Sequence, residues 1–172
     1  MTRFPSLRFF RSAAVLVLVI AALGPAATFA ADEAATAKGT VVYKGKTVTL
    51  RYAYLVKGPD VVDPKLVIRR VVLTPTDVSG RIRACATMSC SDGDLREGMT
   101  VDFGNGPRLN YWVVMNDQRV QYSGTARPEA FTARNDDGRR IAGRLSVDDG
   151  KAGGPAVEVE FDAALVKEFG SK

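Results

Sequence analysis

Hydrophobic and polar residues alternate at every second position along much of the chain, which predicts β-strands. The clearest run is 157–165, where Val157, Val159 and Phe161 alternate with Glu158 and Glu160. A strand of this kind turns its apolar face toward a core and its acidic face toward solvent. We therefore predict a half-buried strand near the end of the chain.

A similar alternation covers residues 47–56 and predicts one strand, which forms an opening hairpin with residues 39–43 across the turn 44–46. Its apolar positions on one face would be Val48, Leu50, Tyr52, Tyr54 and Val56. A third apolar run, residues 66–73, is interrupted by Arg69 and Arg70. Apolar and polar residues next to these two arginines alternate poorly, so the pattern does not show which face of this strand points inward.

Two strand pairings follow from the pattern. A two-residue turn at Asn116 and Asp117 would place Tyr111 opposite Tyr122, and Val113 opposite Val120. Residues 141–147 also alternate and would pair antiparallel with the last strand across the loop 148–155. In that register Phe161 lies over Gly143, and Glu160 opposes Arg144.

The segment 77–97 lacks alternation and contains both cysteines of the chain. Val78, Ile82 and Cys85 are spaced loosely as on a helix, after Asp77 as a candidate cap. We predict a short helix or an ordered loop inserted between strands.

These elements indicate an all-β fold, mainly antiparallel, of about eight or nine short strands in a β-sandwich or a small barrel. An outer-membrane barrel also alternates, but it needs strands of about 9–11 residues with aromatic girdles. Most runs here are shorter, which favours a packed sandwich or barrel.

The first thirty residues resemble a cleavable secretory signal. Arg3, Arg8 and Arg11 precede an apolar run at 13–23, which Gly24 and Pro25 end before it is long enough to span a bilayer. We predict a signal peptide at 1–30, a flexible lead-in at 31–38 and a single β-rich domain at 39–172. The mature protein would be periplasmic or secreted, with no stable membrane insertion.

Charge gives little support to a nucleic-acid partner. The whole chain has 24 basic and 19 acidic residues, a net charge of +5. Three of the basic residues lie in the signal segment, so the mature chain would carry +2. An exported chain with this balance is not expected to bind DNA or RNA.

The chain contains no histidine. Triads that use imidazole as the base and His-ligated zinc or copper sites are therefore excluded. Carboxylates, lysine, tyrosine or oxygen-ligated metals would have to carry any reaction. We expect no cofactor and no catalytic residue set.

Cys85 and Cys90 are the only cysteines, and an oxidising compartment favours a disulfide between them. Redox catalysts usually have two residues between their cysteines, whereas four intervene here. We expect a structural link; a redox-active pair and unpaired or intermolecular cysteines are the alternatives.

Acidic turns recur along the chain, and clustered carboxylates can hold calcium. The first candidates are Asp92, Asp94 and Glu97. None of the turns matches the twelve-residue calcium loop, and Asp-Gly is also a common way to build a turn. The turn interpretation is favoured.

Basic residues gather at Arg139, Arg140 and Arg144, and guanidinium groups on one sheet face can grip phosphate or carboxylate. Glu158, Glu160 and Asp162 would be available as partners across the strands. A charge-paired face is therefore the favoured interpretation. Trp112 falls on the opposite face of its strand from Tyr111 and is expected to be partly exposed, as a second candidate partner contact.

Three functions remain open at this point. The first is a non-catalytic binding or interaction module of the cell envelope, whose partner is an envelope protein or polymer. The second is a lipocalin-like carrier of a small apolar ligand, which predicts an enclosed pocket. The third is a hydrolase that uses paired carboxylates such as Asp92, Asp94 and Glu97, which predicts two acids in one cleft with one of high pKa.

Overall fold

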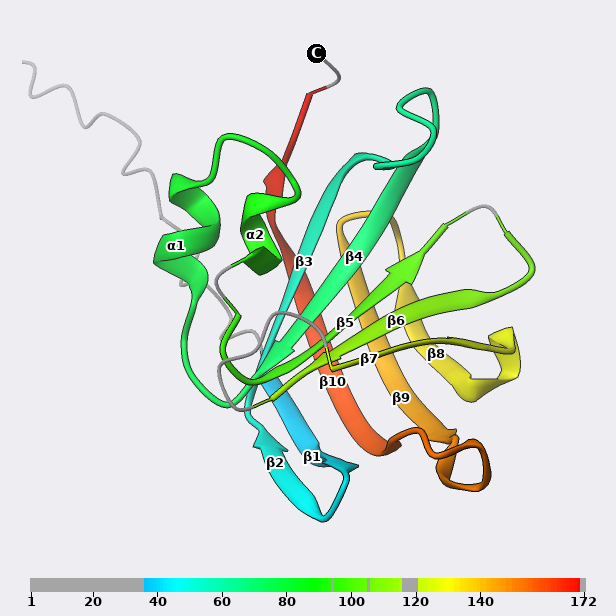
Figure 1. Cartoon of the computed structure of the whole chain (residues 1–172). Coiled ribbons are helices and arrows are strands. Elements are labelled where there is room, and N and C mark those ends of the chain that lie inside the picture. Colours follow the sequence, from blue (N-terminus) through cyan, green and yellow to red (C-terminus); the bar gives the residue numbers. More distant parts are fainter. Residues whose placement is uncertain (1–35, 94, 105, 116–120, 171–172) are drawn as a thin grey trace, which may run out of the picture. The chain divides into compact units, whose positions relative to one another are not determined.

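Strands dominate the computed structural model, which describes residues 36–93, 95–104, 106–115 and 121–170, all within the compact unit Asp32–Lys172. Ten strands lie in the described residues (Figure 1). They are β1 (Thr36–Tyr43), β2 (Lys46–Leu50), β3 (Tyr52–Pro59), β4 (Val67–Thr74), β5 (Gly98–Phe103), β6 (Leu109–Val114), β7 (Tyr122–Ala126), β8 (Phe131–Asp136), β9 (Arg140–Asp148) and β10 (Ala156–Glu168). The short helices are α1 (Ser79–Ala84), α2 (Cys90–Gly93), η1 (Pro128–Ala130) and η2 (Gly150–Ala152).

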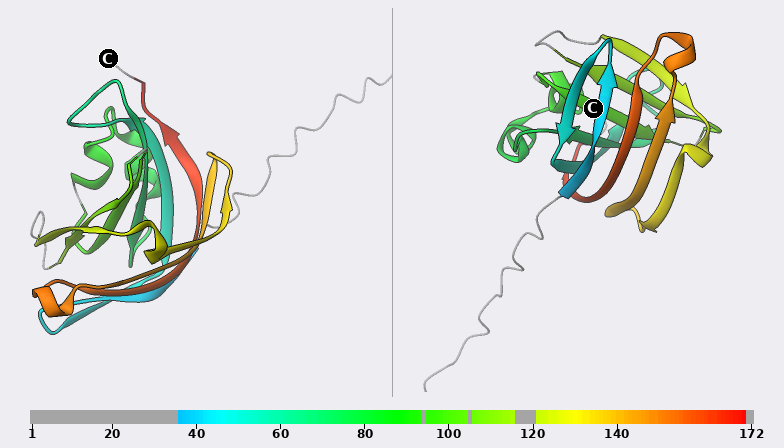
Figure 2. Two further views of the ribbon diagram at one scale, coloured as in Figure 1. Left: turned by 90° about the vertical axis from the view of Figure 1, so that its right-hand side faces the viewer. Right: turned by 90° about the horizontal axis from the view of Figure 1, so that it is seen from below.

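The strands form one curved sheet in which β10 is the link. Along the first part of β10, β1 pairs on one side and β9 on the other, while β3 pairs with its last part. From β3 the sheet continues through β4, β5 and β6 to β7. Figure 2 shows β10 bending between the layer of β2, β1, β9 and β8 and the layer that starts at β3. The β10–β3 pair is parallel and the other described pairs are antiparallel, which confirms the mainly antiparallel all-β prediction.

The sheet is packed on both faces over part of its area. The main core fills the concave side and includes the fully buried Leu50, Leu55, Leu73, Tyr111 and Phe161. A second core forms where α1 and α2 cover the outer face of β3 and β4; it contains Tyr54, Val56, Val72, Ile82 and Phe169. Both faces of β4 are therefore buried, which explains why residues 66–73 alternate so poorly in hydrophobicity.

The pairing of the last two long strands confirms the predicted register. Phe161 lies opposite Gly143, and Glu160 lies opposite Arg144. The ring of Phe131 from β8 stacks on Phe161, with the ring centroids 5.5 Å apart. A side chain on Gly143 would collide with that Phe131 ring, so glycine makes room for the aromatic pair.

The prediction of one uninterrupted strand over 47–56 is wrong. The chain divides into β2 and β3 at Arg51, whose backbone N–H donates to Thr74 O at 3.0 Å. Beyond Arg51 the residues that face the main core are Ala53 and Leu55, not Tyr52 and Tyr54. The change of face at Arg51 sends Tyr54 to the second core under the helices.

The predicted register of β6 and β7 is also wrong. Tyr111 lies opposite Gly124 and Val113 lies opposite Tyr122, two residues away from the predicted pairing. A tight turn at Asn116 and Asp117 falls outside the described residues. The offset of two keeps each side chain on its predicted face, because the period of a strand is two.

The first strand begins at Thr36, within the predicted lead-in 31–38. Residues 36–38 pair with 160–162 of β10, and Ala37 N donates to Arg51 O at 2.9 Å. The insert 77–97 forms α1 and α2, as the lack of alternation indicated. Asp77 Oδ1 accepts from Ser79 N at 2.8 Å, one residue before the N-cap Val78.

Candidate functional site

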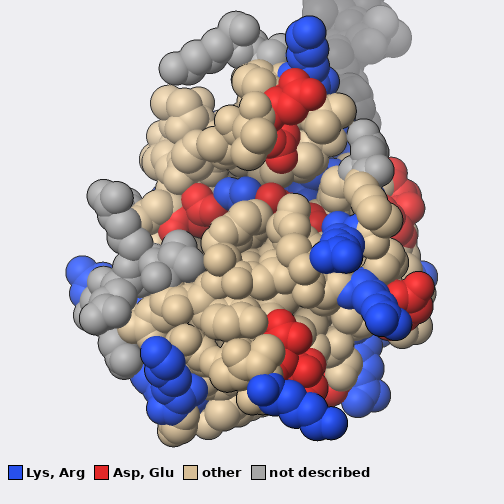
Figure 3. All heavy atoms as spheres, turned by 45° about the vertical axis from the view of Figure 1, so that its right-hand side comes forward, with Lys and Arg blue, Asp and Glu red and all other residues tan. Residues whose placement is uncertain are grey.

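A cleft of about 640 Å³ lies on the outer face of β4, β5 and β6, beside the second core. The volume falls in the range of small-molecule sites, about 300–1,000 Å³. Its lining comes from the sheet, α2 and the β3–β4 loop, and comprises Asp60, Val61, Val62, Arg70, Ser89, Asp92, Gly93, Thr100, Asp102, Asn110, Trp112 and Val114. Figure 3 shows acidic and basic surfaces side by side in a furrow between surfaces formed by uncharged residues.

The floor of the cleft follows from strand pairing. Arg70 of β4 lies opposite Asp102 of β5, which lies opposite Asn110 of β6. In the next outward-facing row, Thr100 lies opposite Trp112. Neighbouring strands lie about 4.8 Å apart, so these side chains stand in contact distance on one face.

The charged centre of the cleft is a triad built on Arg70. Its Nε and Nη2 donate to the two oxygens of Asp102 at 2.6 and 2.8 Å, and its Nη1 donates to Oδ2 of Asp92 at 2.6 Å. The side chains of Arg70 and Asp102 are each 8% exposed, while that of Asp92 is 23% exposed. The two-pronged contact with Asp102 fixes the plane of the guanidinium group.

Trp112 borders the triad. The guanidinium carbon of Arg70 lies 5.1 Å from the centroid of the indole ring, a cation–π distance. The indole is half-buried, which confirms the predicted partial exposure on the face opposite Tyr111. Ring and triad therefore lie in contact on the floor of the cleft.

Burial and charge shift two pKa values in the triad. Desolvation alone would lower the pKa of Arg70, but hydrogen bonds and attraction from Asp102 and Asp92 outweigh it and raise the pKa. Desolvation raises the pKa of Asp92 more than the attraction of Arg70 lowers it. The two carboxylates therefore stabilise the charged form of Arg70, and burial makes the ionised form of Asp92 less favoured than in water.

Helix α2 brings Asp92 to the triad, and the disulfide holds α2. Cys85 caps the C-terminus of α1, and Cys90 begins α2; the two are joined, with their Cα atoms 5.5 Å apart. The predicted pair is thus confirmed. Lys167 of β10 donates to the backbone oxygens of Arg83 and Cys85, which secures the end of α1 to the sheet.

The residues predicted from the acidic turns are not gathered into one site. Asp92 bonds to Arg70 in the cleft, whereas Glu97 pairs with Lys46 of β2. Asp94 lies outside the described residues. No group of three or more acidic or cysteine side chains suited to a metal ion occurs in the part of the chain that the structure describes.

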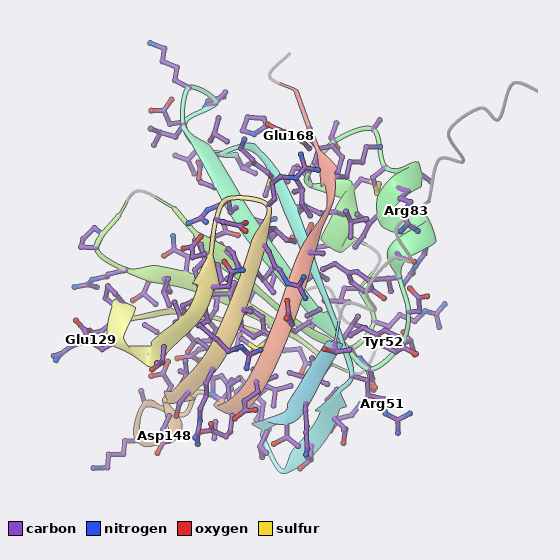
Figure 4. The ribbon with its side chains drawn as sticks, turned by 180° about the vertical axis from the view of Figure 1, so that it is seen from behind. Arg51, Tyr52, Arg83, Glu129, Asp148 and Glu168 are labelled. Carbon is purple, nitrogen blue, oxygen red and sulfur yellow. A yellow bond between two sulfur atoms is a disulfide. The ribbon has the colours of Figure 1, made fainter. Side chains whose placement is uncertain are left out.

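The arginines predicted as an anion or partner contact lie on β9 and its entry turn, away from the residues that line the cleft. Arg140 bonds to both oxygens of Asp162 at 2.6 and 2.9 Å, and Arg144 pairs with Glu158. Arg139 is exposed. Figure 4 shows this side of the sheet, with Asp148 at the end of β9 and Glu168 near the end of β10. Arg140 and Arg144 thus form ion pairs between strands, which agrees with the favoured interpretation of a charge-paired face.

Comparisons with known proteins leave the site to be judged on its geometry. No protein-family model, curated protein or solved structure matches this chain. The helices in the described part of the chain lack the length and apolar character needed to cross a membrane. The argument for function therefore rests on the cleft.

Sequence reasoning missed Arg70 and Asp102, the two most buried charges of the site. The available signal was the placement of Arg69 and Arg70 inside an otherwise apolar run. A charged residue on a strand buried on both faces requires a partner, and that requirement points to a buried ion pair. Only the pairing of β4 with β5 identifies Asp102 as that partner.

Proposed function

We propose that this chain is an exported binding protein of the cell envelope and that the Arg70–Trp112 cleft is its binding site. The observation that carries the proposal is a ligand-sized cleft whose polar groups are held in advance by a buried triad. A site arranged before binding loses less entropy when a ligand docks. The apolar walls and convergent polar groups are typical of binding clefts.

Export is the part of the proposal that rests on the first thirty residues and on the disulfide. Disulfides persist in oxidising compartments and are rare in the cytosol. Protein purified from the envelope or the medium of a bacterial host should begin at or near Ala31. N-terminal sequencing that recovers Met1 would contradict export by a cleaved signal.

The carrier alternative receives less support. A lipocalin-like carrier holds its ligand inside the barrel, among the inward side chains. Here the concave side is filled by Leu50, Leu73, Met99, Tyr111 and Phe161, each at most 2% exposed. The described cleft lies on the opposite face of β4, β5 and β6. A ligand would therefore bind outside the main core.

Carboxylate-based hydrolysis is the second candidate, favoured by one observation. Asp92 and Asp102 share the cleft, and burial shifts the pKa of Asp92 upward, the direction that a general acid needs. Against it, both carboxylates accept hydrogen bonds from Arg70, and Asp102 is held by two of them. Release of reducing sugar from envelope polysaccharide, lost in Asp92→Asn, would favour hydrolysis over simple binding.

The binding proposal is tested by filling the cleft. Gly93 lines it, and a Cβ built there meets no atom within 4 Å, so Gly93→Phe adds bulk at the wall without a core clash. Gly80 on α1 is equally open but does not line the cleft, which makes Gly80→Phe the matched control. Immobilised wild type and Gly80→Phe should retain the same envelope component, and Gly93→Phe should lose it. Equal retention by all three would overturn the proposal.

A further inference from the structure

The charge of the cleft favours a cation over an anion. Its lining holds three carboxylates, Asp60, Asp92 and Asp102, against the single guanidinium of Arg70. That guanidinium already donates from Nε, Nη1 and Nη2 to two of the carboxylates. An incoming anion would have to displace a carboxylate from Arg70, whereas a cation would meet a lining with more acidic than basic groups.

Acceptor positions remain for such a cation. The carboxylate of Asp92 accepts from Arg70 and from its own backbone N–H, and since a carboxylate offers about four acceptor positions, further positions remain for a cation. At the rim, Oδ1 of Asp60 accepts from the backbone N–H groups of Val62 and Asp63 at 2.6 and 3.0 Å, which fixes that carboxylate in place. Two oriented carboxylates thus stand on different walls of the cleft.

The uncharged lining is mixed: Ser89, Thr100 and Asn110 are polar, and an apolar part lies beside them. Val61 and Val62 on the β3–β4 loop are 68% and 93% exposed, and they flank the cleft together with Trp112 and Val114. Covering apolar surface contributes about 25 cal/mol per Å². Exposed aliphatic side chains beside a charged floor suit a ligand with a charged end and an apolar body.

We propose that the cleft binds an organic cation: an ammonium or guanidinium group on an apolar chain, received between Asp92 and Asp60 with its body against Trp112 and the valines. The inference rests on the proposed function and names the ligand class of the same site. The chemistry is shared by a lysine or arginine side chain of a polypeptide and by a free amine, and the test separates the two.

Trp112 provides the readout, because it is the only tryptophan of the chain. Its emission is followed while hexylammonium, hexanol or hexanoate is added, three probes of similar size that differ in charge. Hexylammonium should bind at least about tenfold more tightly than either other probe. Equal or tighter binding of hexanol or hexanoate, or no response to hexylammonium at about 10 mM, would overturn the cation assignment.

Variants locate the charge that matters. Asp92→Asn should weaken hexylammonium binding about tenfold and leave hexanol binding unchanged. Asp136→Asn is the matched control, since Asp136 also pairs with an arginine, Arg69, but does not line the cleft. It changes the net charge equally and should leave both affinities as in wild type. If both variants weakened hexylammonium binding equally, the net charge of the protein would explain the loss, and the assignment to Asp92 would be contradicted.

A peptide pair separates the two sources of the cation. If the natural ligand is a polypeptide side chain, acetyl-Leu-Lys-Leu-amide should bind more tightly than hexylammonium and lose that advantage when its lysine is Nε-acetylated. If the ligand is a free amine, hexylammonium should bind more tightly than the peptide. Either order supports a cation. A failed cation test would leave the binding proposal standing. That proposal is tested separately, by capture of an envelope component on immobilised Gly93→Phe protein.

Discussion

The two faces of β4, β5 and β6 use the same backbone for opposite purposes. The inward residues Val71, Leu73, Val101, Tyr111 and Val113 are fully or almost fully buried in the main core. The outward residues, one position away on each strand, include Arg70, Asp102, Asn110 and Trp112, which line the cleft. The inner face is what folding alone would favour. The outer face removes charges from water at a cost of several kcal/mol per ion before pairing, and this is why we place the proposed binding site there.

The largest expected effect comes from breaking the triad on the outer face. Arg70→Ala leaves Asp102 and Asp92 without their counter-ion and should lower the free energy of unfolding by about 3–5 kcal/mol. Urea denaturation measures it. The double variant Arg70→Met with Asp102→Leu removes the most buried pair and leaves only the partly exposed Asp92 without its partner, so it should recover most of the loss. A double variant as unstable as Arg70→Ala would show that the triad itself stabilises the fold.

Breaking the inner face should cost stability without touching the site. Leu73 is fully buried, and Leu73→Ala should lower the free energy of unfolding by about 3 kcal/mol through lost burial and a residual cavity. The affinity of the cleft for hexylammonium should stay within about twofold of wild type. A large loss of affinity in a folded Leu73→Ala protein would contradict the separation of the two faces.

The disulfide connects stability to the cleft wall. Cys85→Ser with Cys90→Ser should lower the free energy of unfolding by about 2 kcal/mol, as the chain-entropy description of a short loop gives. Because α2 carries Asp92, the double variant should also bind hexylammonium more weakly. Unchanged affinity would mean that packing alone holds α2.

Acid distinguishes Asp92 from Asp77. Burial raises the pKa of Asp92 above its ordinary 3.8, so the folded state takes up a proton before the unfolded chain does, and this group makes unfolding harder as pH falls toward 3.8. The hydrogen bond from Tyr54 lowers the pKa of Asp77, whose contribution is present above 3.8 and lost as pH falls through its folded value. Urea titrations between about pH 3 and pH 7 should therefore show a steeper acid loss in Asp92→Asn and a shallower one in Asp77→Asn.

The smallest effect is expected on the charge-paired side of the sheet. Arg144 and Glu158 form an exposed pair, and exposed pairs are screened by water and salt. Glu158→Gln should leave the urea midpoint unchanged within error at physiological salt. A clear shift would show that this ladder of charges stabilises the sheet more than its exposure implies.

Predictability differs between the parts of the fold for identifiable reasons. The register of β9 and β10 followed from Gly143, Phe161, Arg144 and Glu160, because one face of each strand is apolar and the other charged. The register of β6 and β7 did not, because the length of the loop between them decides it. The division at Arg51 was also hidden, since apolar residues continue through it while the buried face changes.

The site was predictable only in fragments. Trp112 and Asp92 were named from the sequence, but one as a partner contact and the other as a metal or catalytic candidate. Gly98, at a φ of +134°, allows β5 to start against Leu73 O, where a Cβ would lie 2.2 Å away; β5 then pairs Asp102 with Arg70. The sequence around Arg70 does not predict Asp102 as its partner, because 32 positions separate the two residues.

The sequence by itself determined the all-β class, the insert between strands, the disulfide and the charge-paired ladder on β9 and β10. Each depends on interactions between residues close along the chain or on a strict period of two. The tertiary structure alone decided that Arg70, Asp92, Asp102 and Trp112 meet in one cleft. They come from β4, α2, β5 and β6, and a charge buried on a strand finds its counter-ion through the order of the sheet, which local periodicity does not encode.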